Sequence, residues 1–335
     1  MTPTIVFDTY WRFAAERLAM YYRRLADPVG PCTADPILSG FRFTNTYRAA
    51  DRVSQYLISE VQAGADRSQD PREVFFRTIL FKIFNRIETW EAVEHRLGPL
   101  TWANFKAAAL DETLENLRRR GNSIYSAAYI MPSPSYGRER KHSNHIALLL
   151  QMMKDRLPER IKQASSLRTV YELVLSYPGL GPFLAFQYTI DLNYSSLLDF
   201  DEADMVVAGP GALDGISKCF TDTGRATPED VIHWMTDRQE REFARLGLGF
   251  AGLYGRRLQP IDCQNVFCEI SKYARVAHPD IAGIANRTRI KQIYRRSNRP
   301  LPAPQFPARW GLHVPSEQLR LQKASYKEPV QPSFI

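Results

Sequence analysis

The sequence has little of what a membrane-spanning, secreted or zinc-binding protein needs. It contains no uninterrupted run of about 18 apolar residues, and its start, MTPTIVFDTYWRFAAER, lacks the basic and then apolar stretch of a secretion signal. Its four cysteines include no CxxC pair, and its six histidines form no HxxxH or HExxH pair. We therefore expect no membrane contact, no metal site and a reducing compartment.

What is present is an ordinary globular composition. Of the 335 residues, 44% are hydrophobic, 24% charged and 12% aromatic, which is enough for a sizeable core. This length predicts one large domain or two closely packed ones. The net charge of +8 and a pI near 9.3 favour a polyanionic partner, with double-stranded DNA as the leading candidate.

Helical periodicity dominates the chain and strand-like alternation is scarce. Between Phe7 and Leu25 apolar residues recur at spacings of three and four. Thr227 is followed by proline and two acids, a pattern that opens a helix towards Leu246. Further helices are predicted at 49–63, 74–94, 105–120, 145–154, 166–177 and 262–276. The sequence therefore predicts a mainly α fold.

We expect one helical domain over 1–285 and a basic, proline-containing C-terminal extension over 286–335. Five arginines and a lysine crowd the stretch 287–299, and LPAPQFPARWG follows with prolines that prevent regular structure. The extension is predicted to be a tail laid on the body or partly mobile. Its arginines form either a solvated surface or an arm that contacts phosphates.

A helical hairpin is predicted near 170–192. The first helix ends at Pro178, Gly179-Leu180-Gly181 form a tight turn, and a second helix follows. Glycines allow positive φ, and the free N–H groups of a helix start favour an anion. The segment resembles the helix-hairpin-helix of DNA glycosylases, whose hairpin holds a DNA phosphate, often with a monovalent cation. The resemblance implies DNA binding by Gly179 and Gly181 and a monovalent cation there; a purely structural turn is the alternative.

An acidic, glycine-containing loop is predicted over 199–216. The glycosylase superfamily places its active-site aspartate roughly twenty residues after the hairpin, beside the sugar of a flipped nucleotide. We choose Asp204 first, because the apolar residues after it could bury it near a pocket, and Asp201 second. An exposed acidic loop is the alternative. Gly209 and Gly211 are predicted to offer N–H groups to DNA phosphate. Because no lysine follows the hairpin glycines, no Schiff-base lyase is expected.

Five stretches spread over roughly residues 5–280 carry a second resemblance. They are FRFTNTYRAADRVSQYLI (41–58), FFRTILFKIFNRIETWE (75–91), PGLGPFLAFQYTIDLNYS (178–195), GPGALDGISK (209–218) and PIDCQNVFCEISKYARV (260–276). Together they resemble the helical domain linked to 5-hydroxymethyluracil DNA kinases and the related α-glutamyl/putrescinyl-thymine pyrophosphorylases, which serve hypermodification of phage DNA. The resemblance implies that the protein acts in the cytoplasm of a phage-infected bacterium. No GxxxxGK(S/T) occurs, so the chain is not expected to be the kinase itself.

Two polar arrays within these stretches are predicted to bind substrate. Asn45, Arg48 and Arg52 would share one helix face with Asp51 adjacent, where they would bind a phosphorylated base substituent or form a salt-bridge ladder. The residues of the second array are spaced by three and four along the helix 262–276. They are predicted to line a pocket or to form a buried network. Its members are Asp262, Asn265, Glu269, Lys272 and Tyr273, with Glu269 and Lys272 as catalytic candidates. Gln264, Gln187 and Asp191 complete the predicted substrate-binding set.

The stretch 118–145 interleaves aromatic and basic residues. Tyr129 is predicted to stack on or wedge beside bases, and Arg138 and Lys141 to meet DNA phosphates. A charged, solvated loop is the alternative.

These features predict a mainly α, helix-hairpin-helix glycosylase-like transferase. It would flip a 5-hydroxymethylpyrimidine, with 5-hydroxymethyluracil or its phosphate-activated form first in line, out of duplex DNA and attach a small group at the 5-methylene. The donor would be an amino acid, a polyamine or a nucleotide sugar, with Asp204 or Glu269 as base and no required cofactor. The alternatives are a monofunctional DNA glycosylase and a non-catalytic DNA-binding partner of a separate DNA kinase.

Overall fold

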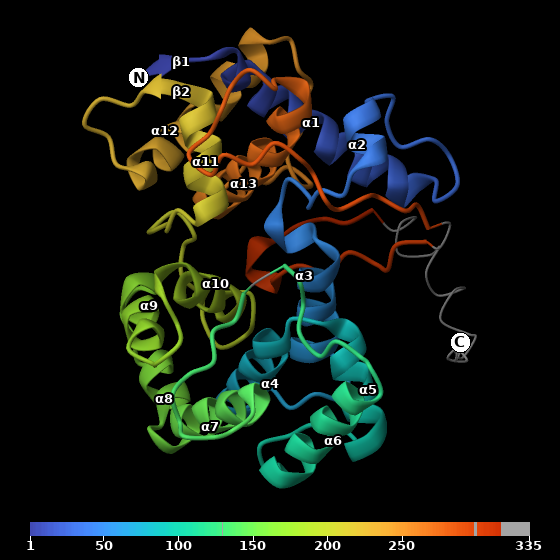
Figure 1. The fold of residues 1–335 in the computed structure, drawn as a ribbon, viewed down its shortest axis with the longest axis vertical. Coiled ribbons are helices and arrows are strands. Elements are labelled where there is room, and N and C mark those ends of the chain that lie inside the picture. Colours follow the sequence, from blue (N-terminus) through green and yellow to red (C-terminus); the bar gives the residue numbers. More distant parts are fainter. Residues whose placement is uncertain (129, 298–299, 316–335) are drawn as a thin grey trace. The chain divides into compact units, whose positions relative to one another are not determined.

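The computed structural model describes residues 1–128, 130–297 and 300–315 and is mainly α-helical, as predicted (Figure 1). Its contacts divide it into two units. Unit 1 comprises 1–51, 208–305 and the chain from 311, and unit 2 comprises 52–207 and 306–310. This division differs from the predicted single domain over 1–285. No helix in the described ranges is long and apolar enough to cross a membrane.

Unit 1 is built around α13, which α1 and α11 contact along their lengths (Figure 1). The strands β1 and β2 pair antiparallel and join the chain start to the end of α11. The elements of unit 1 are β1 (Thr2–Pro3), α1 (Ile5–Ala26), α2 (Pro36–Gly40), the 3-10 turn η1 (Arg48–Ala50), α11 (Pro210–Cys219), β2 (Phe220–Asp222), α12 (Pro228–Arg245) and α13 (Pro260–Ala277). α12 begins at Thr227, as predicted, and the structure adds a capping box in which the side chains of Thr227 and Asp230 accept each other's backbone N–H.

The glycines of the predicted acidic loop lie largely where α11 meets α13. A Cβ on Gly215 would stand 2.0 Å from the carbonyl oxygen of Phe267, and one on Gly211 would stand 2.9 Å from Sγ of Cys268. Gly209 is the buried N-cap of α11. The prediction of a loop through residue 216 is therefore wrong: 210–219 is a helix, and its small residues allow close helix packing.

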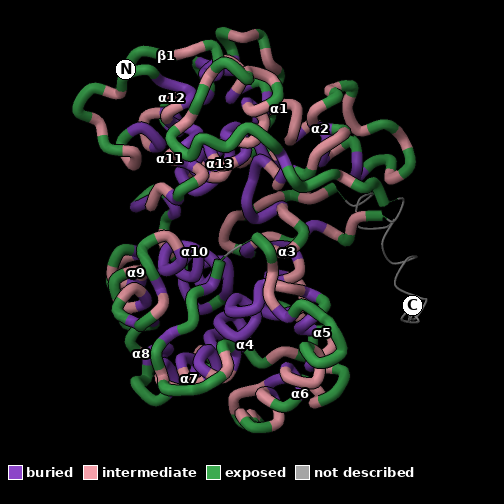
Figure 2. Tube along the Cα trace, in the orientation of Figure 1, coloured by how far each residue is buried: buried purple, intermediate pink, exposed green. Residues whose placement is uncertain are grey.

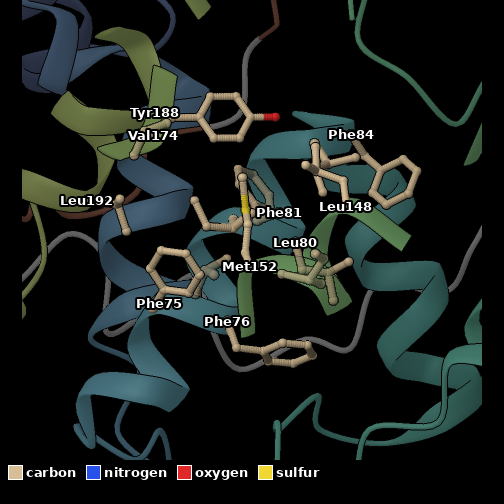
Figure 3. Packing of buried hydrophobic residues seen from close by; sticks show 14 of the residues in the cluster. Phe75, Phe76, Leu80, Phe81, Phe84, Leu148, Met152, Val174, Tyr188 and Leu192 are labelled. Carbon is tan, nitrogen blue, oxygen red and sulfur yellow. The ribbon is translucent and has the colours of Figure 1, made fainter. Parts of the chain in front are cut away.

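Unit 2 is a helical bundle around α4, whose residues from Val74 to Phe84 are all buried (Figure 2). A helix that is apolar on every side belongs in a core. Figure 3 shows its phenylalanines interleaved with side chains of α7, α9 and α10. The elements of unit 2 are α3 (Arg52–Tyr56), the π-helical turn η2 (Leu57–Gln62), α4 (Pro71–Phe84), α5 (Ile87–Leu97), α6 (Ala107–Arg119), α7 (Lys141–Lys154), α8 (Leu157–Lys162), α9 (Leu167–Leu175), α10 (Pro182–Asn193) and the 3-10 turn η3 (Ala308–Trp310).

The predicted hairpin is formed by α9, a tight turn and α10. Gly179 has φ of +82°, a conformation that other residues adopt only with strain, and Gly181 is the N-cap of α10. Tyr177 and Leu180 are buried and anchor the turn, while Pro178 and Gly181 are exposed. The glycosylase-like arrangement around this hairpin stays a prediction.

The first part of the C-terminal extension lies on unit 1 without helix. Arg42 N–H donates to Gln292 O at 2.9 Å, and Tyr294 N–H donates to Gly40 O at 3.0 Å, so the two backbones pair antiparallel. In unit 2, Trp310 packs edge-on against Tyr194. The rest of the predicted tail, 298–299 and 316–335, lies outside the described residues.

Candidate functional site

The polar row of α13 holds the chain segment 42–48. Glu269, which is 6% exposed, accepts hydrogen bonds through Oε2 from Lys272 Nζ at 2.6 Å and from Thr44 N–H at 3.1 Å. Lys272 Nζ also donates to Arg42 O at 3.4 Å. Within the described chain, Oε1 of Glu269 has no hydrogen-bond partner. Glu269 therefore keeps one oxygen available while the other is fixed.

Two further members of the row continue this backbone docking. Asn265 donates through Nδ2 to Asn45 O at 2.7 Å. Asp262 accepts from Arg48 N–H at 2.9 Å and from Gln259 N–H at 3.0 Å. Burial raises the pKa of Asp262 to about 6, although these two N–H donors act in the opposite direction. The hydrogen bonds of Glu269, Asn265 and Asp262 are therefore those of a buried network, which was the alternative to the predicted pocket lining.

Tyr273 and Gln264 make local contacts on the same helix. Tyr273 donates its hydroxyl to Asp35 Oδ2 at 2.7 Å, which ties α13 to the N-cap of α2, and burial raises the pKa of Tyr273. Gln264 is buried and donates to Cys268 Sγ at 3.2 Å. Both predicted substrate-binding side chains therefore have partners within the fold.

The predicted helix face of Asn45, Arg48 and Arg52 does not exist. Asn45 precedes η1 and donates to Ala50 O at 2.5 Å, and Arg48 is buried within η1. Asp51 has ψ of 148°, so the chain is extended there before Arg52 begins α3 in unit 2. Arg52 instead lies 3.7 Å from the carboxylate of Glu88. The prediction was wrong because it assumed one continuous helix.

Arg17 of α1 is a charged neighbour of this row that the sequence reasoning missed. It donates to Phe43 O at 3.4 Å, and it lies within electrostatic reach of Asp51 and Glu269. Burial lowers the pKa of Arg17, while those two carboxylates act to raise it. The available signal was its spacing of four from Phe13, on the apolar face of the predicted helix.

A second missed cluster lies between α11 and α13. Ser271 donates to Asp214 Oδ2 at 2.5 Å, and Lys218 donates to Ser271 O at 3.0 Å. The other carboxylate oxygen of Asp214 accepts from Ala285 N–H at 2.7 Å. Asp214 and Lys218 are each 2% exposed, so the cluster fixes the chain that leads into the extension. Their i, i+4 spacing went unused because 210–219 was expected to be a loop.

In unit 2, Asp191 forms a buried ion pair with Lys82 of α4. The Lys82 Nζ to Asp191 Oδ2 distance is 2.6 Å, and both side chains are almost fully buried. Gln62 of the π-helical turn η2 donates to Asp191 O at 2.8 Å and to Thr78 Oγ1 at 3.1 Å. Gln187, one turn before Asp191, is 2% exposed. The predicted residues Asp191 and Gln187 thus belong to the polar part of this core, and Lys82 was missed.

The acids that follow the hairpin are placed differently from the prediction. Asp204 and Asp201 are exposed, and Asp201 Oδ1 accepts Ala203 N–H at 2.9 Å. The expectation that Asp204 is buried is wrong, because Asp204 is the last residue of this turn and the chain enters the core only after it. Glu202 is the buried acid at 2% exposure, and Arg309 lies 3.9 Å from it.

A basic loop lies against the hairpin turn. A Cβ on Gly179 would stand 3.2 Å from Pro134, so the loop that contains Pro134 packs directly on the turn. Asn144 fixes this loop, because its Oδ1 accepts Arg138 N–H at 3.1 Å and its Nδ2 donates to Arg138 O at 2.8 Å. Arg138 and Lys141 are exposed, as DNA contacts would require. Tyr129 lies outside the described residues.

His145 of α7 hydrogen-bonds the backbone of the same loop. Its Nε2 lies 2.8 Å from Pro132 O and its Nδ1 lies 2.7 Å from the Tyr125 hydroxyl, the pattern of a neutral imidazole that donates to the carbonyl. Burial lowers the pKa of His145 to about 4.

These observations define a two-unit helical protein with a polar row in one unit and a glycine hairpin beside a basic loop in the other. The model of the 5-hmdU DNA kinase helical domain matches residues 4–283. The chain therefore belongs to this family. It is 26% identical over 294 residues to a 5-hmdU DNA kinase of Bacillus phage SP10, a match that covers 81% of this chain but only 45% of the relative. No solved structure matches the chain.

Proposed function

We propose that the chain acts on 5-hydroxymethyluracil, or a closely related 5-hydroxymethylpyrimidine, in double-stranded DNA and transfers a small group to its 5-methylene. Support comes from the family and from the name of the phage relative, a kinase for this base. The observation that carries the proposal is the contact between Gly179 and Pro134, which unites the hairpin and the basic loop on one surface.

This surface, formed by the turn 176–182 and the loop 131–141, suits DNA backbone. The N-terminus of α10 at Gly181 is exposed and carries the partial positive charge of a helix start. Arg138 and Lys141 add formal charge beside it. A monovalent cation at the hairpin is part of the proposal. The target base would leave the helix stack, because chemistry at its substituent needs access from all sides.

Glu269 is the carboxylate that we propose as the base. An amine or hydroxyl nucleophile would attack the 5-methylene while its proton passes to Oε1 of Glu269. The bond from the methylene to the activated oxygen would break, and the leaving phosphate would keep the electron pair. Lys272 would hold Glu269 in place through Oε2. Asp204 and Asp201, being exposed, remain the alternative bases.

A second candidate function is DNA recognition on behalf of a separate kinase. Two observations favour it: no GxxxxGK(S/T) occurs in the 335 residues, and the carboxylates of Asp262 and Glu269 already hold backbone N–H groups. A protein of this kind would bind DNA and change nothing covalently.

The test is the intact mass of a short duplex that contains 5-hydroxymethyluracil, with and without prior phosphorylation, incubated with amino acids, polyamines and nucleotide sugars. A mass gain that Glu269→Gln abolishes and the exposed control Glu172→Gln retains supports the transferase. The DNA affinity of Glu269→Gln should stay unchanged, and its Tm, which the loss of the ion pair with Lys272 lowers, should remain above the assay temperature. An abasic site identifies a glycosylase instead, and tight binding without product identifies the recognition role. Loss of product in Asp204→Asn alone would assign the base to that residue.

A further inference from the structure

The net positive charge of this chain comes almost entirely from residues outside the matched family region. Residues 281–315 contain seven arginines and lysines and no aspartate or glutamate. Residues 1–280 contain 34 of each sign and have no net charge. The formal charge of +8 therefore comes from the stretch that begins where the family match ends, at residue 283. Long-range attraction to a polyanion is concentrated there.

The segment 285–296 of this stretch is fixed to unit 1 at both ends. Ala285 N–H is bound by the buried carboxylate of Asp214, and a Cβ on Gly283 would clash with that same carboxylate. Further on, the guanidinium of Arg296 donates to the carbonyls of Val29 and Gly30. The segment between these anchors is thus a defined part of the surface.

Its middle is paired backbone to backbone with the chain after α2. The bonds of Gln292 and Tyr294 with Arg42 and Gly40 are those of an antiparallel pair, and Arg275 donates to Arg289 O at 3.1 Å. In a paired, extended chain successive side chains point to opposite faces. This pairing holds the segment around Ile293 against the chain after α2.

Four basic side chains of this segment are exposed. Ile290, at 9% exposure, is the buried residue of 287–295, and most of the residues around it are exposed. The basic ones among them are Arg287, Arg289, Lys291 and Arg295. Arg287, Arg289 and Lys291 are alternate residues, which in an extended chain lie about 6.6 Å apart, close to twice the roughly 3.4 Å axial rise between phosphates of one DNA strand. Arg295 follows four residues after Lys291. Arg296 is excluded because it serves as an anchor.

We propose that Arg287, Arg289, Lys291 and Arg295 form a basic track that binds the phosphate backbone of DNA. Guanidinium groups pair with phosphate oxygens in a bidentate manner, and a row of them follows a strand without reading its bases. The proposal rests on DNA being the substrate of the proposed function. It adds a second contact region, on unit 1, to the hairpin surface of unit 2.

The experiment compares two variants that remove the same charge. In the first, the four track residues are changed to Gln; in the second, four exposed residues of unit 2, Lys154, Arg160, Lys162 and Arg168, are changed to Gln. The Kd of a 20-base-pair duplex, with and without 5-hydroxymethyluracil, is measured from 50 to 200 mM salt. We expect the track variant to lose at least about tenfold in affinity at low salt and to flatten the plot of log Kd against log salt by about 3 to 4. The loss should be equal for both duplexes, and the control slope should change by less than about 1.

Equal effects in the two variants, an unchanged slope in the track variant, or no DNA binding by the wild type would overturn the track. Unchanged Tm values establish that both variants are folded. The mass assay on the same proteins separates the two proposals. If the wild type binds DNA through the track but yields no product, the transferase proposal is refuted and the track proposal stands. If product forms but the salt slope of the track variant is unchanged, the track proposal is refuted and the transferase proposal stands.

Discussion

Buried carboxylates of unit 1 hold backbone N–H groups, whereas the buried carboxylate of Asp191 in unit 2 holds the ammonium group of Lys82. In unit 1, Glu269 and Asp262 accept backbone N–H groups of the segment 42–48, and Asp214 accepts that of Ala285. In unit 2, Lys82 pairs with Asp191 inside a bundle of regular helices. Irregular segments leave backbone groups without helix or sheet partners, so side chains must satisfy them. Regular helices satisfy their own backbone, so the carboxylate of Asp191, on the regular helix α10, is paired with a side-chain charge instead.

The largest expected effect breaks the pair in unit 2. Lys82→Met leaves Asp191 charged in an apolar core, and we expect a loss of about 3–5 kcal/mol in the free energy of unfolding of unit 2. Hydrogen exchange of the α4 and α10 amides reports it. The double variant Lys82→Met, Asp191→Leu should recover most of the loss, because no uncompensated charge remains. A double variant no more stable than the single one would show that the pair itself stabilises the bundle.

A smaller effect is expected where the helices of unit 1 meet at short range. Gly215→Ala places a Cβ at 2.0 Å from the Phe267 carbonyl, so α11 and α13 must separate, at a cost of about 1–3 kcal/mol. Gly249→Ala is the control, because a Cβ there would have no atom within 4 Å. Thermal unfolding of both variants checks this. Equal Tm values would show that the contact between α11 and α13 can relax freely.

The third prediction concerns pH, and its sign differs between the units. Asp262 has its pKa raised to about 6, so between pH 4 and 6 the folded state holds a proton that the unfolded state has released, and the stability of unit 1 falls as pH rises. His145 has its pKa lowered to about 4, so the unfolded state binds the extra proton and the stability of unit 2 rises over pH 4 to 6.5. Each slope is at most about 1.4 kcal/mol per pH unit.

Hydrogen exchange at pH 4.5 and 6, corrected for intrinsic rates, should therefore show opposite shifts for amides of α13 and α7. Asp262→Asn should remove the shift in unit 1 only, and His145→Gln the shift in unit 2 only. Parallel shifts in the two units would mean that other titrating groups dominate.

The comparison also separates what could be predicted from what could not. Most of the periodic helices, the N-cap at Thr227 and the glycine turn at Gly179 followed from local rules and are present. The helix predicted at 74–94 is instead divided into α4 and α5 at Asn85, whose φ is +48°. The prediction that Arg48 and Arg52 share a helix face was wrong because the extended residue Asp51 interrupts the helix between them. Residues such as Lys82 and Arg17 were passed over, since a charge within an apolar period resembles any solvated charge until its partner is known.

The sequence by itself determined the mainly helical fold, the hairpin, the family resemblance and the basic character of the extension, because each depends on local spacing or on composition. Only the tertiary structure decided which acids are bonded: Glu202 is buried and Asp204 is exposed, and Asp262 holds Arg48 N–H from 214 residues away. It also paired the extension with the chain at Gly40 and left four basic side chains of that segment exposed. Such pairings depend on contacts between distant segments, and neither periodicity nor charge count carries that information.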